Sequence, residues 1–202
     1  MEPGVFIYTA STAQDFFLPL SETCKTHCLM KSGNIILVGA MGAGKSTVGR
    51  KLARRLDRTF YDSDRVIEEK TGVDIATIFE YEGEEGFRKR EENAIAELCQ
   101  LEAIVLATGG GAVLSRRNRD ALSAAGTVFY LQATVDALFE RVRNDSNRPL
   151  LKTTDRKRTL ADLLLQREPL YMQAADHTIT TGQRGTSWIA DEIVRQLDRS
   201  PG

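Results

Sequence analysis

Residues Gly39–Thr47 have the spacing G-x-x-x-x-G-K-[ST], which is typical of loops that bind nucleotide phosphates. Glycines let successive backbone N–H groups turn toward one phosphate, and the N-terminus of a following helix adds its positive end. Lys45 can reach the β- and γ-phosphates of ATP, and the Ser46 hydroxyl can coordinate Mg²⁺. The candidate nucleotide-binding residues of this loop are Gly42, Ala43, Gly44, Lys45, Ser46 and Thr47. The alternative is a glycine-rich turn that carries Lys-Ser by chance, and the strand-like and helix-like segments on either side argue against it.

Two carboxylates, Asp62 and Asp64, follow the short predicted strand Thr59–Tyr61. The carboxyl ends of parallel strands lie along one rim of a sheet, so both side chains can face the phosphate loop. One carboxylate could hold Mg²⁺ through water, and the other could accept a proton from a hydroxyl that attacks the γ-phosphate. The spacing leaves open the alternative that Asp62 or Ser63 only caps the next helix.

Two arginines and a run of glycines suggest an acceptor that carries a carboxylate. Arg88 and Arg167 each offer a guanidinium fork that binds carboxylates through two hydrogen bonds, and Glu91 is spaced to pair with Arg88 on a helix. The run Gly109–Gly111 follows a predicted strand and allows a ligand to approach the backbone closely. The alternatives are a solvated helix charge at Arg167 and an ordinary tight turn at the glycines.

The segment Asn144–Lys157 is polar, charged and without periodicity, and we expect it to form a mobile lid. Within this segment Arg148 precedes Pro149 and could close over the transferring phosphoryl group to stabilise its charge. The alternative is a solvated loop.

Strand-like and helix-like segments alternate along the chain, which predicts an α/β fold with a parallel sheet covered on both faces. The predicted strands are Asn34–Val38, Thr59–Tyr61, Ala103–Ala107, Thr127–Leu131 and His177–Thr180. The predicted helices are Lys45–Leu56, Asp62–Lys70, Asp74–Phe79, Glu84–Leu101, Ser115–Ala125, Thr134–Arg143, Leu160–Met172 and a closing helix marked by Ile189, Ile193 and Leu197. We expect one domain over residues 34–202 and a poorly ordered extension over residues 1–33.

The composition excludes several classes of protein. The 202 residues carry a formal net charge of −1, so the chain lacks the basic field that gathers nucleic acid. No apolar run approaches the roughly 18 residues that cross a bilayer, and the start of the chain does not resemble a secretory signal. Three cysteines fit a reducing compartment, and Cys24, His27 and Cys28 make at most half of a zinc site. We therefore expect a soluble cytoplasmic protein.

Together the motifs resemble the shikimate kinase family of P-loop proteins, from about Asn34 to Arg199. The resemblance rests on the phosphate loop, Tyr61–Asp64, Gly83–Arg88 with Glu91, Thr108–Val113, Arg148–Leu151 and Arg167–Tyr171. It implies a P-loop three-layer α/β/α fold with a five-stranded parallel sheet in the order 2-3-1-4-5 and a mobile lid. It also implies transfer of phosphate from ATP to the 3-hydroxyl of shikimate, a step of aromatic amino-acid biosynthesis, with Mg²⁺ as cofactor and a monomer as the expected state.

The resemblance also implies a role for each matching residue. Asp64 would bind the shikimate hydroxyls and act as base, with Lys45 and Arg148 as further catalytic residues, while Asp62 and Ser46 would hold Mg²⁺. The remaining substrate-binding residues would be Arg88, Gly109, Gly110, Gly111 and Arg167, with Glu91 positioning Arg88. Arg141 would stack on adenine, and Arg184 would lie on the nucleotide side with Arg148.

Two alternatives to this function remain. The first is a related kinase for another hydroxylated acid such as gluconate, and the paired aspartates with the two arginines and the glycine run argue against it. The second is a nucleotide-binding protein that has lost its chemistry, which should have lost Lys45, Asp64 or Arg148 first, and all three are present.

The segment before the first strand generates a prediction about stability. A chain that starts at Met30 contains every motif above, so we expect residues 1–29 to be dispensable and Met30 to be the natural start. Expression of residues 30–202 should give the melting temperature and activity of the full chain. A clear loss of either would mean that the extension packs on the domain.

Overall fold

The computed structural model describes residues 33–143, 153–182 and 184–199. The predictions for the extension over residues 1–32, for Met30, for most of the lid and for Arg148 lie outside the described residues. Within the described parts of the chain, none of the helices is both long and apolar enough to cross a membrane.

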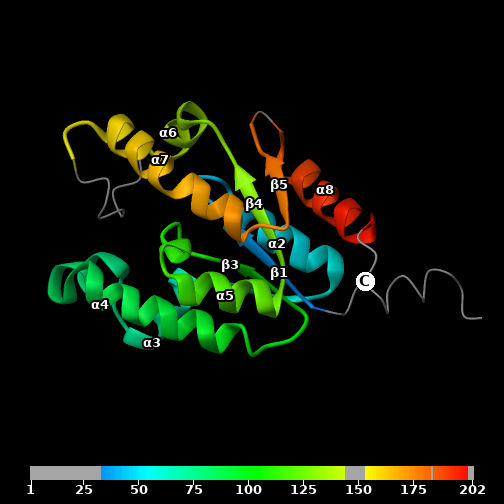
Figure 1. Ribbon diagram of the computed structural model, residues 1–202, viewed down its shortest axis with the longest axis horizontal. Coiled ribbons are helices and arrows are strands. Elements are labelled where there is room, and N and C mark those ends of the chain that lie inside the picture. The colour runs from blue at the N-terminus through cyan, green and yellow to red at the C-terminus, as the bar shows by residue number, and fades with distance from the viewer. Residues whose placement is uncertain (1–32, 144–152, 183, 200–202) are drawn as a thin grey trace, which may run out of the picture.

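A five-stranded parallel sheet forms the centre of the fold, in the order β2-β3-β1-β4-β5 (Figure 1). The strands are β1 (Asn34–Val38), β2 (Thr59–Asp62), β3 (Ile104–Ala107), β4 (Gly126–Gln132) and β5 (His177–Thr180). On the central strand Ile36 lies opposite Leu106 of β3 and Val128 of β4, and all three side chains are buried. A strand that is buried on both faces reads as a continuous apolar run, which is why β1 was predictable to the residue. The predicted fold and strand order are confirmed.

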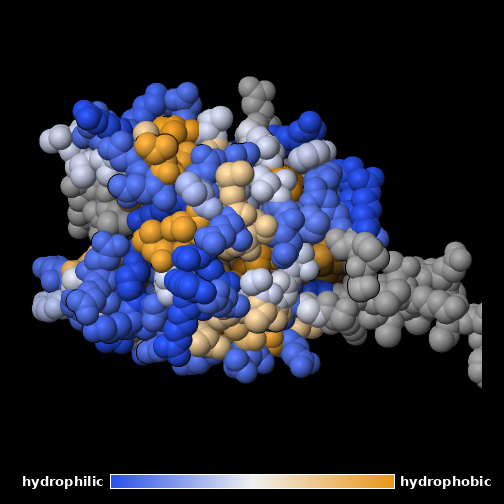
Figure 2. All heavy atoms as spheres, in the orientation of Figure 1, coloured by the Kyte–Doolittle hydropathy of each residue, from blue (hydrophilic) through white to orange (hydrophobic). Residues whose placement is uncertain are grey.

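Helices cover both faces of the sheet (Figure 1). They are α2 (Lys45–Leu56), α3 (Ser63–Thr71), α4 (Ile75–Leu98), α5 (Arg116–Ala125), α6 (Val135–Val142), α7 (Arg156–Ala174) and α8 (Thr186–Arg199), with a short 3-10 helix η1 at Ala112–Leu114. Helix α2 contacts α8, while α5 contacts α7 and η1. Figure 2 shows one face of the molecule, which is mostly hydrophilic with a few hydrophobic patches. The exposed large hydrophobic residues include Leu165 and Met172 of α7 and Leu114 of η1.

Helix α4 consists of two helical segments that meet at a kink at Gly83, as predicted. It corrects only their bounds, because the first segment continues past Phe79 to the kink and the second ends at Leu98 rather than Leu101. Gly83 has φ 68° and ψ −176°, in the region that favours glycine, so the backbone changes direction without a clash at Cβ. Asp74 caps the first half by accepting a hydrogen bond of 2.7 Å from the Thr77 amide. Across the break the Arg90 guanidinium donates twice to the Glu82 carboxylate, at 2.8 and 2.6 Å.

Helix α7 corrects a second prediction, because it starts at Arg156 rather than Leu160. The Asp155 carboxylate accepts a hydrogen bond of 3.0 Å from the Arg158 amide and so caps the helix. The first turn carries no apolar residue before Leu160, so it gave no signal of amphipathic periodicity. Residues 156 and 157 therefore belong to a helix and not to the predicted lid.

Asn34 at the start of β1 generates a prediction about stability. Its side chain is 4% exposed, donates to the Leu101 carbonyl at 2.7 Å and accepts from the Ile104 amide at 3.1 Å. Asn34→Ala should lower the free energy of unfolding by about 2 kcal/mol, because it leaves both backbone groups without this partner. Urea denaturation measures the change, and Asn93→Ala, at an exposed position on α4, should stay within about 0.5 kcal/mol of wild type. Equal stability of the two variants would contradict the prediction.

Candidate active site

The phosphate loop has the backbone shape that its glycines allow. Gly39, Gly42 and Gly44 have φ values of 141°, 79° and 94°, and Gly44 is the N-cap of α2. The Lys45 ammonium is 8% exposed and donates to the carbonyls of Gly39 at 2.7 Å and Ala40 at 2.9 Å. The loop therefore places a cation and the N-terminus of a helix next to one another, a combination that suits phosphate groups.

Asp62 at the end of β2 serves two partners at once. One carboxylate oxygen accepts a hydrogen bond of 2.6 Å from the Ser46 hydroxyl. The other oxygen accepts from the Asp64 amide at 3.2 Å and so caps α3. Capping and a place in the site were posed as alternatives, and the structure contains both. Two oxygen donors side by side near a phosphate loop fit Mg²⁺, which keeps most of its water and binds through one or two protein oxygens together with substrate phosphates.

A cavity of about 310 Å³ joins the phosphate loop to the sheet rim. Its lining residues are Met41, Gly42, Gly44, Lys45, Ser46, Thr47, Asp62, Asp64, Thr108, Gly110 and Arg141. The structure thus brings both predicted aspartates, a residue of the glycine run and Arg141 to one cavity. Ala43 is 1% exposed and shapes the loop, since its amide donates to the Ala40 carbonyl at 3.2 Å.

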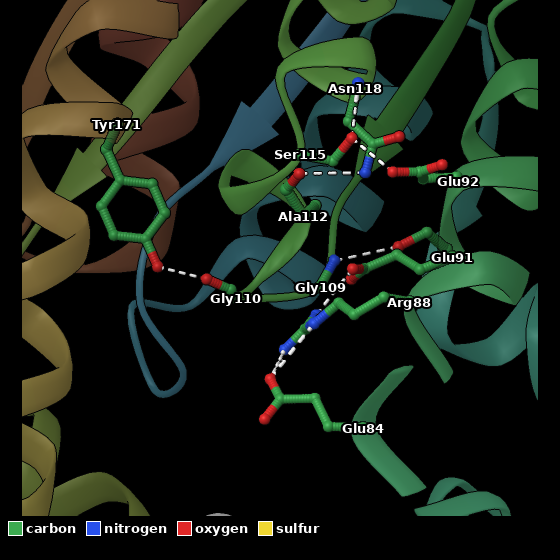
Figure 3. A network of polar contacts seen from close by, with 11 residues as sticks. Glu84, Arg88, Glu91, Glu92, Gly109, Gly110, Ala112, Ser115, Asn118 and Tyr171 are labelled. Atoms are coloured by element: carbon green, nitrogen blue, oxygen red, sulfur yellow. Dashed lines mark hydrogen bonds and ion pairs between the residues drawn. The ribbon is translucent and has the colours of Figure 1, made fainter. Parts of the chain in front are cut away.

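Arg88 on α4 lies between two carboxylates at the edge of the glycine run (Figure 3). One guanidinium nitrogen lies 2.6 Å from Glu91, which is 1% exposed, and another lies 2.9 Å from Glu84. Burial raises the pKa of the Glu91 carboxyl, and the charges of Arg88 and Arg167 oppose that shift. The predicted Arg88–Glu91 ion pair is therefore present, and it fixes the direction of the Arg88 fork.

The glycine run is confined by charged side chains from α3 and α4. A Cβ atom at Gly109 would lie 2.5 Å from an Asp64 carboxylate oxygen and 2.7 Å from a Glu91 oxygen. A Cβ atom at Gly111 would overlap the Arg88 guanidinium. The glycines thus let the side chains of Asp64 and Arg88 approach the same stretch of backbone. An ordinary tight turn would not need glycine at both Gly109 and Gly111 for this reason.

Hydrogen bonds hold this glycine turn from three directions. The Gly109 amide donates to the Ser63 hydroxyl at 2.9 Å, and the Tyr171 hydroxyl donates to the Gly110 carbonyl (Figure 3). The buried Asn118 amide donates to the Ala112 carbonyl at 3.0 Å. Sequence reasoning gave none of these contacts, although Ser63 stands between the two aspartates.

Arg167 on α7 faces the interior and is only 6% exposed, which excludes a solvated helix charge. Its positive charge acts on both the Glu91 carboxyl and the Tyr171 phenol, so the Arg167 guanidinium lies near both groups. Among the described residues its Nε atom has no hydrogen-bond partner. A buried guanidinium with a spare donor suits an anionic ligand.

Two further arginines lie on the other side of the phosphate loop. Arg141 on α6 donates to the Gly42 carbonyl and to the Gly182 carbonyl, each at 3.1 Å. The Arg184 guanidinium lies 4.1 Å from the centroid of the Trp188 ring. Arg141 therefore joins the phosphate loop to the loop between β5 and α8, where Arg184 also lies.

The parallel sheet and the phosphate loop between β1 and α2 define a P-loop nucleotide-binding fold. A family model described as shikimate kinase matches residues 41–198. A shikimate kinase of Nitrosospira multiformis is 54% identical over 166 residues, which are 82% of this chain and 85% of the relative. One from Haemophilus influenzae is 53% identical over 170 residues, 84% of this chain and 94% of the relative.

Solved structures agree with these relatives. The shikimate kinase of Acinetobacter baumannii in complex with shikimate has a TM-score of 0.83 and 46% identity, and the match covers 85% of this chain and 96% of that one. A gluconokinase of Sinorhizobium meliloti has a TM-score of 0.51 at 16% identity, over 84% of this chain and 93% of that one, which shows a shared fold alone. The chain belongs to the shikimate kinase family.

The position of Lys45 generates a prediction about nucleotide binding. Lys45→Met should weaken the affinity for Mg²⁺-ATP by about 10- to 100-fold, because charge-assisted hydrogen bonds to phosphate are lost. Isothermal titration calorimetry measures this change. Lys51→Met is the matched control on the same helix, since the Lys51 ammonium donates to Ser187 at the surface. Unchanged affinity of the Lys45 variant would remove this side chain from the phosphate site.

Proposed function

We propose that the protein transfers the γ-phosphoryl group of ATP to the 3-hydroxyl of shikimate, giving shikimate 3-phosphate and ADP in aromatic amino-acid biosynthesis. The observation that carries the proposal is the glycine turn, where the Asp64 carboxylate and the Arg88 guanidinium reach one stretch of backbone next to the phosphate cavity. A hydroxyl and a carboxylate of one small acid can meet these two groups together. The relatives named shikimate kinase, and the similar structure that holds shikimate, support this acceptor.

On the nucleotide side, the backbone amides of the phosphate loop and the Lys45 ammonium would bind the β- and γ-phosphates. Ser46 and Asp62 would hold Mg²⁺, which in such sites neutralises charge on the phosphate oxygens. Arg141 and Arg184 would bind the adenosine part. Arg141 donates to the Gly182 carbonyl, and Arg184 lies two positions after Gly182, in the loop between β5 and α8. Arg148 remains a predicted contact to the transferring group.

On the acceptor side, the Asp64 carboxylate would orient the 3-hydroxyl of shikimate and take its proton. The hydroxyl oxygen then forms a bond to the γ-phosphorus, the bond from that phosphorus to the bridging oxygen breaks, and ADP leaves. Asp64 lines the cavity together with Lys45, so base and phosphate site share one space.

The substrate carboxylate would lie between Arg88 and Arg167. The positive charges of both guanidinium groups act on the buried Glu91 carboxyl, which supports a shared carboxylate site, and the ion pair with Glu91 fixes the orientation of Arg88. Two guanidinium forks around one carboxylate fix its orientation and also balance its charge, whereas two lysines would supply the charge alone. We further propose that the enzyme acts in the cytoplasm, since three cysteines fit a reducing compartment, and that it is a monomer, as the family resemblance implies.

One coupled assay tests the proposed function. ADP release is measured with shikimate, with gluconate and with no acceptor, at equal concentrations of Mg²⁺-ATP. Release that depends on shikimate is the expected result. Faster release with gluconate, or equal release in all three reactions, would overturn the proposed acceptor.

The base assignment gives a prediction for Asp64→Asn. The turnover of the variant should fall by about 10²- to 10⁴-fold, because the general base is lost. Its affinity for ATP should stay within about twofold of wild type, because the substitution removes none of the proposed contacts to the phosphates. Steady-state kinetics and calorimetry measure the two quantities. Asp120→Asn, at an exposed position on α5, is the control and should keep wild-type turnover. An Asp64 variant within about threefold of wild type would exclude Asp64 as the base.

The carboxylate clamp gives a prediction for Arg88→Lys and Arg167→Lys. Each variant should raise the KM for shikimate by about tenfold or more and leave the KM for ATP within about twofold, because lysine keeps the charge but loses the fork. Arg65→Lys, at an exposed position on α3, controls for the substitution itself. An unchanged KM for shikimate in both site variants would show that the clamp lies elsewhere.

A further inference from the structure

Tyr171 places a phenol oxygen beside the glycine turn of the proposed acceptor site. The residue follows Arg167 by four positions on α7, so both side chains lie on the same face of the helix. Tyr171 has no exposed surface, and its hydroxyl donates to the carbonyl of Gly110 (Figure 3). Gly110 itself lines the cavity that contains the phosphate loop. The hydroxyl thus connects the helix that carries Arg167 to the glycine turn.

The orientation of the Tyr171 ring is fixed by a second tyrosine. The rings of Tyr130 and Tyr171 stack with their centroids 5.1 Å apart and an interplanar angle of 20°. The Tyr130 hydroxyl and the Gln132 amide donate to one oxygen of Glu168, at 3.3 and 2.9 Å. Because Glu168 is next to Arg167 on α7, these bonds hold the helix against β4. The phenol oxygen of Tyr171 therefore has little freedom to move.

Arg167 acts directly on this phenol oxygen. Burial raises the pKa of the Tyr171 phenol to about 12, while the positive charge of Arg167, one turn earlier on α7, opposes the shift. At neutral pH the hydroxyl keeps its proton, which it gives to the Gly110 carbonyl. Its lone pairs then remain available to accept from the guanidinium. One hydroxyl thus satisfies a carbonyl of the glycine turn and keeps acceptor capacity for the nearby Arg167 guanidinium.

We propose that Tyr171 is a positioning residue for the acceptor, because its hydroxyl holds the Arg167 fork and the Gly110 carbonyl in one fixed arrangement before the substrate arrives. The inference rests on the proposed function, since it assigns Arg167 to the carboxylate of shikimate. Without the hydroxyl, binding of the substrate carboxylate must also order the Arg167 side chain, and the entropy lost in doing so weakens the affinity for the acceptor. The nucleotide contacts, on the other side of the phosphate loop, are unaffected.

The first test is Tyr171→Phe, which removes one oxygen atom and keeps the stacked ring. The KM for shikimate should rise about tenfold, as for the loss of one hydrogen bond to a charged group, while the KM for ATP stays within about twofold. Tyr81→Phe is the control, because it removes a phenol hydroxyl from an exposed side chain of α4 outside the cavity lining. It should leave the KM for shikimate within about twofold of wild type.

A second variant separates the two contacts of the hydroxyl and guards against misfolding of the first. With p-aminophenylalanine at position 171, the donor to Gly110 is kept, but the aniline nitrogen is a poor acceptor for Arg167. The KM for shikimate should therefore rise in this variant as well. A double-mutant cycle with Arg167→Lys should be non-additive, because both changes act on the same carboxylate contact.

The outcomes separate this inference from the function on which it rests. If the wild-type enzyme does not use shikimate, the proposed function fails. If wild type uses shikimate but both position-171 variants keep its KM within about twofold, the positioning role is wrong. A drop in melting temperature with both KM values unchanged, or raised equally, would likewise overturn it and leave Tyr171 as a core residue only.

Discussion

The space next to the glycine turn is the constraint on which the site depends. Charged side chains from α3 and α4 occupy the positions where Cβ atoms of Gly109 and Gly111 would lie. An alanine at either position would displace Asp64 or Arg88 and, through Arg88, the buried Glu91. The acid and the cation that this site brings together can coexist only because the backbone between them has no side chains.

This constraint explains why the turn is held so firmly. Ser63, Tyr171 and Asn118 bond three successive parts of the turn from α3, α7 and α5. Glycine stretches lose more conformational entropy on folding than any other sequence, so an unsupported turn would sample many shapes. The surrounding helices replace the missing side chains as the source of rigidity, and one of them, α3, also carries Asp64 beside the turn.

Patterns that are local in sequence were predictable, and contacts between distant residues were not. The strand Asn34–Val38 is an asparagine followed by four apolar residues and a glycine, so its bounds followed directly. The start of α7 was missed because its first turn is charged. The sequence leaves open whether Asp62 caps a helix or faces the phosphate loop, whereas in the structure one oxygen caps α3 and the other accepts from Ser46 of the loop. The role of Tyr171 depends on Gly110, 61 residues away, and no periodicity reports such a contact.

The break in α4 divides one helix into two rods that meet at a joint. Glu84, which pairs with Arg88, is the first residue after the joint. A change in the angle between the two rods would therefore shift a partner of Arg88. The Glu82–Arg90 ion pair spans the joint as a brace, and its side chains are 38% and 43% exposed. Salt screens exposed pairs far more than buried ones, so the stiffness of this joint falls as ionic strength rises, while the buried Glu91 contact to Arg88 is preserved.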